Sequence, residues 1–236
     1  MSVVRMRSGR LTPGGNARAG VTRTVVGLLA IAFGSLGLAT LASAEGEAAS
    51  SARGEQLFAL CTQCHGTAGE GNRDALAPAI AGLPAWYLEA QLNKFRAGIR
   101  GLHAEDTGGL RMYPMSQWLR TDEDAKAVAG YVASLPATNP APALEAHGDA
   151  GRGAGYYAVC SACHMPNGSG NQGMGAPPLV GMNDWYLLES IRKYKASIRG
   201  SNPRDNLGQA MIGMVATLPS DEAILDVIAH IQSLDK

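Results

Sequence analysis

Four cysteines in this sequence lie in two close pairs, and a histidine directly follows each pair. The two motifs are Cys61, Cys64 and His65, and Cys160, Cys163 and His164. Two thiols three positions apart can bond covalently to both vinyl groups of one haem, and the adjacent histidine can then place its Nε2 over the iron. The sequence therefore predicts two covalently bound haem c groups, one at each motif.

Other uses of these cysteines fit the pattern less well. Disulfides are common in exported chains, and four cysteines can also form a zinc site. The histidine that follows each close pair favours haem attachment over both. A thioredoxin-like redox pair requires a βαβ setting, and it explains neither the histidines nor the recurrence of the motif.

The two motifs belong to an internal repeat of 99 residues. Between residues 54–135 and 153–234, 29 of 82 positions are identical without a gap. The shift places Trp86-Tyr87-Leu88 on Trp185-Tyr186-Leu187, and Ile99-Arg100-Gly101 on Ile198-Arg199-Gly200. This agreement indicates a duplicated domain.

Methionines recur at two positions in each repeat and are candidate second ligands of the iron. They are Met112 and Met115 in the first repeat, and Met211 and Met214 in the second. A thioether opposite histidine gives a six-coordinate iron with a raised reduction potential, which suits electron transfer. The alternative is that these methionines fill the core. We expect one ligand from each pair, and spacing alone does not choose between its members.

Several further residues are candidates to line or support the haem groups. Pro78 and Pro177 each follow their histidine by 13 residues, so a nearby carbonyl can accept the second N–H of the ring; the alternative is an ordinary turn. Arg100 and Arg199 can pair with haem propionates or be solvated. Four aromatic residues are candidates for haem edges, the domain interface or plain core packing: Trp86, Tyr87, Trp185 and Tyr186.

The N-terminal 44 residues have the pattern of a secretory signal peptide. They contain five arginines and no acidic residue, then the apolar run Val25–Leu41 and the small residues Ala42-Ser43-Ala44. We expect cleavage after Ala44; an uncleaved membrane anchor is the alternative. Either outcome predicts a periplasmic location for the folded part.

Charge and composition exclude some classes of function. Residues 45–236 carry 15 basic and 20 acidic side chains, a net charge of −5. An acidic body argues against a nucleic-acid-binding protein, whose affinity depends on basic side chains. A hydrophobic fraction of 46% argues against both a disordered chain and a multi-span membrane protein.

The pattern of elements predicts an all-α fold of two tandem domains, each a few helices around one covalently bound haem. No alternating run is long enough for a sheet. We expect the last helix to start at Thr121 in the first repeat and at Ser220 in the second, since either residue can cap a helix. We also expect a glycine-containing loop that carries each methionine pair. The other expected helices cover about 52–60, 86–97, 154–159 and 185–196. The expected domains are 45–136 and 151–236, with a proline-containing linker at 137–150.

On these residues, the chain resembles the tandem di-haem class I cytochromes c of the cytochrome c4 family. The resemblance covers about Arg53 to Leu234. It rests on both C-x-x-C-H motifs, on the Pro-x-hydrophobic-x-Gly segments Pro78–Gly82 and Pro177–Gly181, and on the methionine segments before the last helix.

This resemblance implies which methionines bind iron. In the family, the axial methionine lies seven residues before the apolar residue that precedes the last helix. Leu119 and Leu218 hold that place here, which points to Met112 and Met211. The resemblance also implies the proline carbonyl contact to each histidine, and a pseudo-twofold axis that brings the haem propionates together near the domain interface.

We expect a carrier of single electrons between a quinol:cytochrome c reductase and a terminal oxidase. The alternative is the cytochrome subunit of a dehydrogenase complex, which performs the same chemistry with another partner. A di-haem peroxidase requires a vacant position on one iron, and matched Met112 and Met211 argue against that. We therefore predict no catalytic residue and no enzymatic activity.

Overall fold

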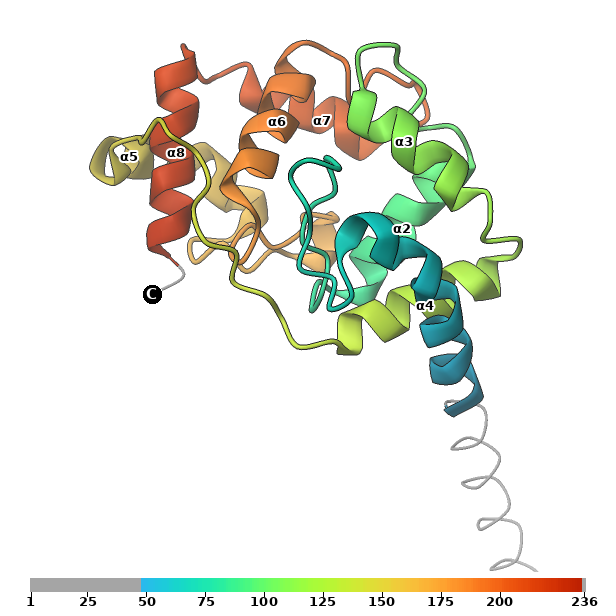
Figure 1. Cartoon of the computed structure of the whole chain (residues 1–236). Helices are drawn as coiled ribbons and strands as arrows, with labels where there is room; N and C mark the ends of the chain where they lie inside the picture. Colours follow the sequence, from blue (N-terminus) through green and yellow to red (C-terminus); the bar gives the residue numbers. More distant parts are fainter. Residues whose placement is uncertain (1–47, 235–236) are drawn as a thin grey trace, which may run out of the picture. The chain divides into compact units, whose positions relative to one another are not determined.

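The computed structural model describes residues 48–234, so the predicted signal peptide lies outside the described residues. The helices are the segment 48–65, α2 (Ala85–Arg96), α3 (Thr107–Ser116), α4 (Asp122–Ser134), α5 (Ala150–His164), the 3-10 turn η1 (Gln172–Met174), α6 (Asp184–Lys195), α7 (Asn206–Val215) and α8 (Asp221–Ser233). Residues 48–234 form no β-strand, and strand-like pairing is limited to two isolated bridges. The predicted all-α class is confirmed (Figure 1).

The 99-residue repeat is also a repeat of structure. Helices α2, α3 and α4 begin and end 99 positions before α6, α7 and α8, and both cysteine motifs end a helix. In the second repeat (153–234), α5 packs on α8, and α6 contacts both α7 and α8 (Figure 1). In the first repeat (54–135), α2 contacts α3 and α4.

Each repeat has its own apolar core. Phe58 and Leu88 pack with Val128 and Val132 of α4 in the first repeat. Tyr157, Leu188, Val227 and Ile231 are among the residues that form the second core. The buried positions of α4 and α8 recur at helical spacing, which is the pattern that predicted these helices.

The last helix of each repeat starts where the sequence predicts. The hydroxyl of Thr121 accepts a hydrogen bond from the backbone N–H of Asp124, at 3.1 Å, and Ser220 does the same for Ala223, at 3.3 Å. Acidic residues in the first turn face the positive end of the helix dipole.

The first and last helices of each repeat approach closely at a glycine. A Cβ atom on Gly54 would lie 2.3 Å from the carbonyl oxygen of Ala127, and one on Gly153 would lie 1.9 Å from that of Asp226. Neither distance is possible for a real side chain. These two glycines therefore set how near the cysteine-bearing helix lies to the last helix.

Two kinds of expected element were wrong, one in extent and one in type. The cysteine-bearing helices continue through the motifs to 65 and 164, past the predicted ends at 60 and 159. The methionine pairs lie on helices α3 and α7, not on loops. The sequence did not predict α3 as a helix, because glycines in its first turn and Pro114 are residue types that disfavour helix. A buried aspartate cap at each N-terminus offsets that cost.

The segment between the repeats is held by side chains from both. The backbone N–H groups of Ala143 and Leu144 donate to Asp184 Oδ2, at 2.7 and 2.9 Å. Arg73 of the first repeat donates to the carbonyl of Ala143, at 2.7 Å.

Among residues 48–234, no helix is both long enough and apolar enough to cross a bilayer.

Candidate functional site

The cysteine–histidine motifs end their helices beside two cavities. The first cavity, of about 420 Å³, is lined by Cys61, Cys64 and His65. The second, of about 210 Å³, is lined by Cys160, Cys163 and His164. Residues three positions apart share one face of a helix, so both thiols of a motif face the same cavity. None of the four forms a disulfide, and all four are partly buried.

The first thiol of each motif lies in surroundings that favour its neutral form. Burial raises the pKa of Cys61 to about 11, with a smaller contribution from the charge of Cys64. Burial also raises the pKa of Cys160. Thiolate ligands of a metal ion require the opposite shift. The surroundings of Cys61 and Cys160 by themselves therefore favour the thiol over the thiolate.

Each motif histidine is oriented by a proline carbonyl. The distance from His65 Nδ1 to the Pro78 oxygen is 2.8 Å, and His164 Nδ1 lies 2.8 Å from the Pro177 oxygen. A carbonyl only accepts, so Nδ1 carries the proton and the Nε2 lone pair is free for a metal. Burial lowers the pKa of both histidines, against the effect of the carbonyl. The rings are thus neutral, as metal ligation requires.

The loop between histidine and proline is closed by backbone hydrogen bonds. Gly71 N–H donates to the His65 carbonyl at 2.8 Å, and Asn72 and Ala77 exchange two backbone bonds. The second repeat closes in the same way through Gly170, Asn171 and Ala176. This closure places the proline carbonyl beside the imidazole.

Both methionines of each pair line the cavity that holds the histidine of the same repeat. Met112 and Met115 project from α3 into the lining of the first cavity, and Met211 and Met214 from α7 into that of the second. Met214 is 41% exposed, whereas Met112, Met115 and Met211 are partly buried. The two cavities are therefore supplied with the same kinds of donor.

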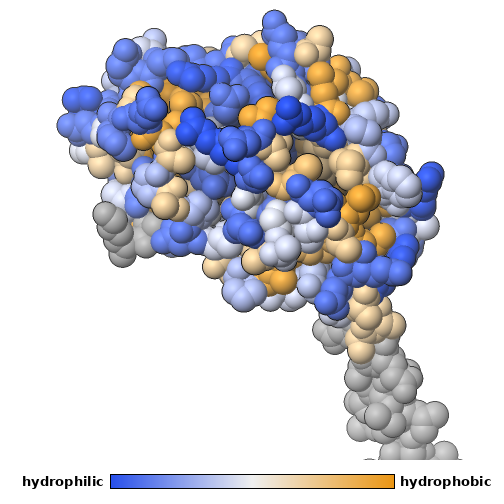
Figure 2. Space-filling view, in the orientation of Figure 1, coloured by the Kyte–Doolittle hydropathy of each residue, from blue (hydrophilic) through white to orange (hydrophobic). Residues whose placement is uncertain are grey.

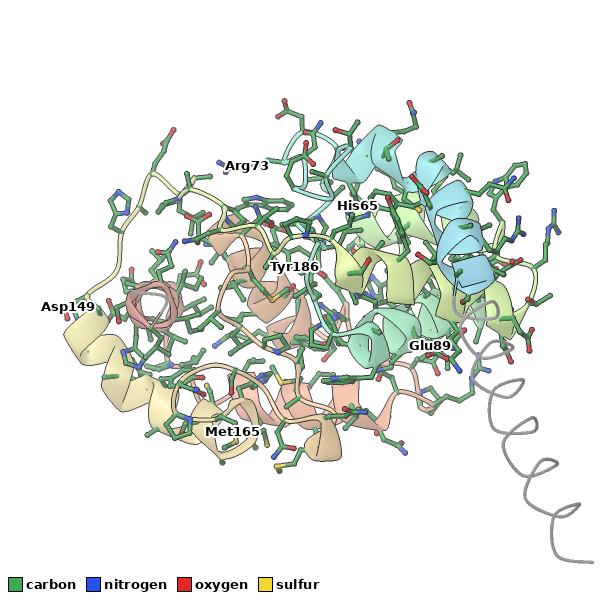
Figure 3. All side chains as sticks on the ribbon, turned by 90° about the horizontal axis from the view of Figure 1, so that it is seen from below. His65, Arg73, Glu89, Asp149, Met165 and Tyr186 are labelled. Carbon is green, nitrogen blue, oxygen red and sulfur yellow. The ribbon has the colours of Figure 1, made fainter. Side chains whose placement is uncertain are left out.

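Each cavity is completed by the other repeat, which the sequence did not reveal. Trp185 of α6 lines the first cavity, and Trp86 of α2 lines the second. Tyr87 and Tyr186 line both, and Figure 3 shows Tyr186 between the helices of the two repeats. The aromatic residues therefore belong to the interface and to the cavities at once. Met182 also lines both cavities.

Two guanidinium groups meet at this interface. Arg100 donates to the Tyr186 hydroxyl at 2.9 Å and to Gln91 Oε1 at 2.8 Å. Arg199 donates to the same Gln91 oxygen at 3.4 Å and to Ser190 at 3.2 Å. Within residues 48–234 neither guanidinium forms an ion pair with a carboxylate, and the buried Nε of Arg100 has no hydrogen-bond partner.

The pKa of the neighbouring Tyr186 phenol reflects this positive charge. Burial alone would raise the pKa of Tyr186, but Arg100 and Arg199 outweigh it and lower the pKa to about 7. Arg199 is buried and Arg100 is partly buried, and a buried cation without an ion-pair partner is costly. An anionic group between the cavities would relieve that cost, and the carboxylates of haem are such groups. Together with the thiols, the imidazoles and the apolar linings, these residues fit two haem groups.

Comparison with known proteins agrees with this geometry. The model of the Cytochrome c family matches residues 51–136 and again 150–235. Cytochrome c4 of Azotobacter vinelandii is 30% identical over 208 residues, which is 84% of this chain and 94% of that protein. The chain belongs to the cytochrome c4 family. This cytochrome carries two covalently bound haem c groups, one in each repeat, and is a di-haem electron carrier of the cytochrome c4 type.

Other similar proteins include a second cytochrome c4 and two proteins named for other roles. The crystal structure of reduced recombinant cytochrome c4 from Pseudomonas stutzeri has a TM-score of 0.60 and 27% identity, covering 77% of this chain and 97% of that one. A thiosulfate dehydrogenase electron acceptor from Stutzerimonas stutzeri (strain A1501) is 30% identical, over 72% of this chain and 76% of that protein. The cbb3-type cytochrome c oxidase subunit CcoP of Rubrivivax gelatinosus is 31% identical over 78% of this chain, which spans 54% of that subunit.

Proposed function

We propose that this cytochrome carries single electrons in the periplasm between respiratory complexes, from a quinol:cytochrome c reductase to a terminal oxidase. The observation that supports this most directly is the matched donor set of the two cavities. Each contains a neutral histidine with a free Nε2 and a pair of methionines on the same kind of helix. An iron closed on both sides has no position for a substrate.

In this proposal every donor has one role. Cys61, Cys64, Cys160 and Cys163 hold the haem groups by thioether bonds. His65 and His164 would each bind one iron through Nε2, and Met112 and Met211 would each supply the second protein ligand. The haem groups supply a reversible one-electron iron couple. The protein orients each imidazole through Pro78 or Pro177 and excludes water with its apolar lining.

Arg100 and Arg199 have a proposed role toward the haem carboxylates. Both are at the interface, and within residues 48–234 neither forms an ion pair with a carboxylate. Propionates placed beside them would bring the two haem groups close to one another. That closeness suits electron exchange between the repeats.

Exposed apolar residues around the cavities support contact with a partner protein. Trp118 and Leu60 are exposed and line the first cavity. Leu207 and Met174, exposed as well, line the second. Figure 2 shows apolar residues reaching the visible surface in separate patches among polar ones. Such patches beside a redox centre are suited to a transient docking partner.

A dehydrogenase complex is the second candidate for the source of electrons. One relative is a thiosulfate dehydrogenase electron acceptor, whereas another is a subunit of a cbb3-type oxidase. The carrier chemistry of the two candidates is the same. They differ in the partner that reduces the protein.

The test is electron transfer with purified partners. We expect the reduced cytochrome to be oxidised rapidly by a terminal oxidase, and the oxidised form to be reduced by a quinol:cytochrome c reductase. Reduction only by a co-purifying dehydrogenase would favour the second candidate. Rapid carbon monoxide binding at one haem together with peroxide turnover would contradict both and indicate a peroxidase. The protein purified from the periplasmic fraction should begin at Glu45.

A further inference from the structure

Each methionine-bearing helix begins at a buried aspartate that pairs with a lysine of the other repeat. Asp106, the N-cap of α3, lies 3.0 Å from the Nζ atom of Lys193 on α6. Asp205, the N-cap of α7, lies 2.6 Å from the Nζ atom of Lys94 on α2. Both lysines and both aspartates are related by the 99-residue shift. Two equivalent ion pairs therefore cross the interface in opposite directions.

These ion pairs are largely removed from water. The aspartate side chains are 4% exposed, and those of the lysines are 20–21% exposed. Burial alone would raise the pKa of Asp106, but Lys193, the N–H of Gly109 and Arg100 outweigh it and lower the pKa. Removing one partner of a buried pair leaves an uncompensated charge and is strongly destabilising.

The aspartates are locked onto the first turn of the methionine helices. Asp106 Oδ1 accepts the N–H of Gly109, and Asp205 Oδ1 accepts that of Gly208, both at 3.0 Å. A Cβ atom on Gly109 would lie 2.1 Å from Asp106 Oδ2, so only glycine leaves room for the carboxylate. The position of each aspartate therefore affects the position of the helix that carries the methionines.

We infer that Lys94 and Lys193 are positioning residues, each for the iron-ligand methionine of the opposite repeat. The inference rests on the proposed ligation by Met112 and Met211. Lys193 neutralises and fixes the cap of α3, and so holds Met112 toward the first haem. Lys94 does the same for α7 and Met211. Each haem thus depends on the other repeat for its sixth ligand.

Helices α3 and α7 differ in how many other contacts tie them to the opposite repeat. Arg204 donates to the carbonyl of Ala97 at 2.8 Å, and Asn202 donates to that of Gly98 at 3.4 Å. Both bonds tie the segment before α7 to the first repeat. In the described structure, the equivalent residues before α3, Glu105 and His103, form no hydrogen bond to the second repeat. The first haem therefore depends more on Lys193 than the second depends on Lys94.

The decisive variant is Lys193→Met, studied in the haem-loaded protein. It leaves the Asp106 carboxylate buried without its cation, and nearby negative charge stabilises the oxidised iron. We expect the potential of the first haem to fall and the NMR signal of its ligand methionine to be lost at a lower temperature. The second haem should not change. Lys94→Met should affect only the second haem, and to a smaller extent.

Four variants make the readout specific. Met112→Ala and Met211→Ala assign each methionine signal to its haem. Arg192→Gln is the matched control, because Arg192 precedes Lys193 on the same helix and pairs with exposed Asp221 of its own repeat; both haems should keep their potentials. Lys193→Arg should preserve the ion pair and the wild-type behaviour.

A double variant separates charge from packing. Lys193→Met combined with Asp106→Asn removes the buried charge but keeps an acceptor for the helix N-terminus, since asparagine is also a good N-cap. The potential of the first haem should return toward the wild-type value.

A change in the second haem alone after Lys193→Met, or no change in either, would overturn the inference. If the wild-type protein showed no signal from a ligand methionine, the proposed ligation would be wrong. A fall in the potential of the first haem after Lys193→Met would then still show that this lysine acts on the haem of the opposite repeat.

Discussion

At the scale of single residues, the histidine of each motif illustrates how the chain prepares a ligand before the metal is considered. Burial lowers the pKa of His65 and His164, and the proline carbonyls fix which ring nitrogen carries the proton. The carbonyls of Pro78 and Pro177, 99 residues apart, make the same contact with their histidines. The two imidazoles are consequently presented in the same way.

The choice of methionine is a prediction at this scale. Met112→Ala and Met211→Ala should each remove one sulfur-to-iron charge-transfer band from the spectrum of the oxidised protein, because each deletes one thioether ligand. Met115→Ala and Met214→Ala are the matched controls, since they lie three residues further on the same helices and also line the cavities. If the controls lost the bands instead, the ligand assignment would move by three residues.

At the scale of helices, close approach between the first and last helix of each repeat places the cysteine motif. The contacts at Gly54 and Gly153 leave no space for a side chain. The cap aspartates act similarly at α3 and α7, where the local sequence disfavours helix and a tertiary contact supports it. Helix position in this protein is thus set by backbone contacts as well as by apolar faces.

Gly153→Ala tests this packing. The added Cβ would meet the backbone of Asp226, which cannot rotate away, so we expect destabilisation at the upper end of the overpacking range, about 3 kcal/mol. Thermal or denaturant unfolding of the haem-loaded protein measures it. Gly155→Ala is the matched control on α5, because no atom lies within 4 Å of its added Cβ. We expect it to stabilise α5 by about 1 kcal/mol, so equal effects of the two variants would refute the packing argument.

At the scale of the whole described chain, the two repeats share one interface and complete one another's cavities. Trp86 and Trp185 each line the cavity of the other repeat, and Gln91 accepts hydrogen bonds from both interface arginines. The haem groups are therefore expected to influence one another.

Their mutual influence is measurable as two reduction potentials. Reducing one haem adds negative charge near the other and disfavours the second electron. We expect spectroelectrochemical titration to resolve two one-electron steps from a protein with two haem groups per chain. Both irons should stay low-spin in both oxidation states. A single two-electron step, or one haem per chain, would contradict the expectation.

The sequence by itself determined the chemistry and the repetition of this protein. Cysteine and histidine spacing is a local property, because thioether attachment needs two thiols on one turn of helix, and the 99-residue shift is visible without any structure. The all-α class and the starts of α4 and α8 followed from apolar spacing and capping residues, which are also local. The methionine pairs were recognised for the same reason, although their helices were taken for loops.

Only the tertiary structure decided how the repeats depend on one another. The pairing of Lys94 with Asp205 and of Lys193 with Asp106 is not visible in their own segments, since the partners lie more than 80 positions apart in the chain. The helical state of α3 also depends on such a contact, because its glycines and Pro114 oppose helix locally. Spacing along the sequence reports neighbours on one helix. It does not report which surfaces meet when two copies of a domain fold against each other.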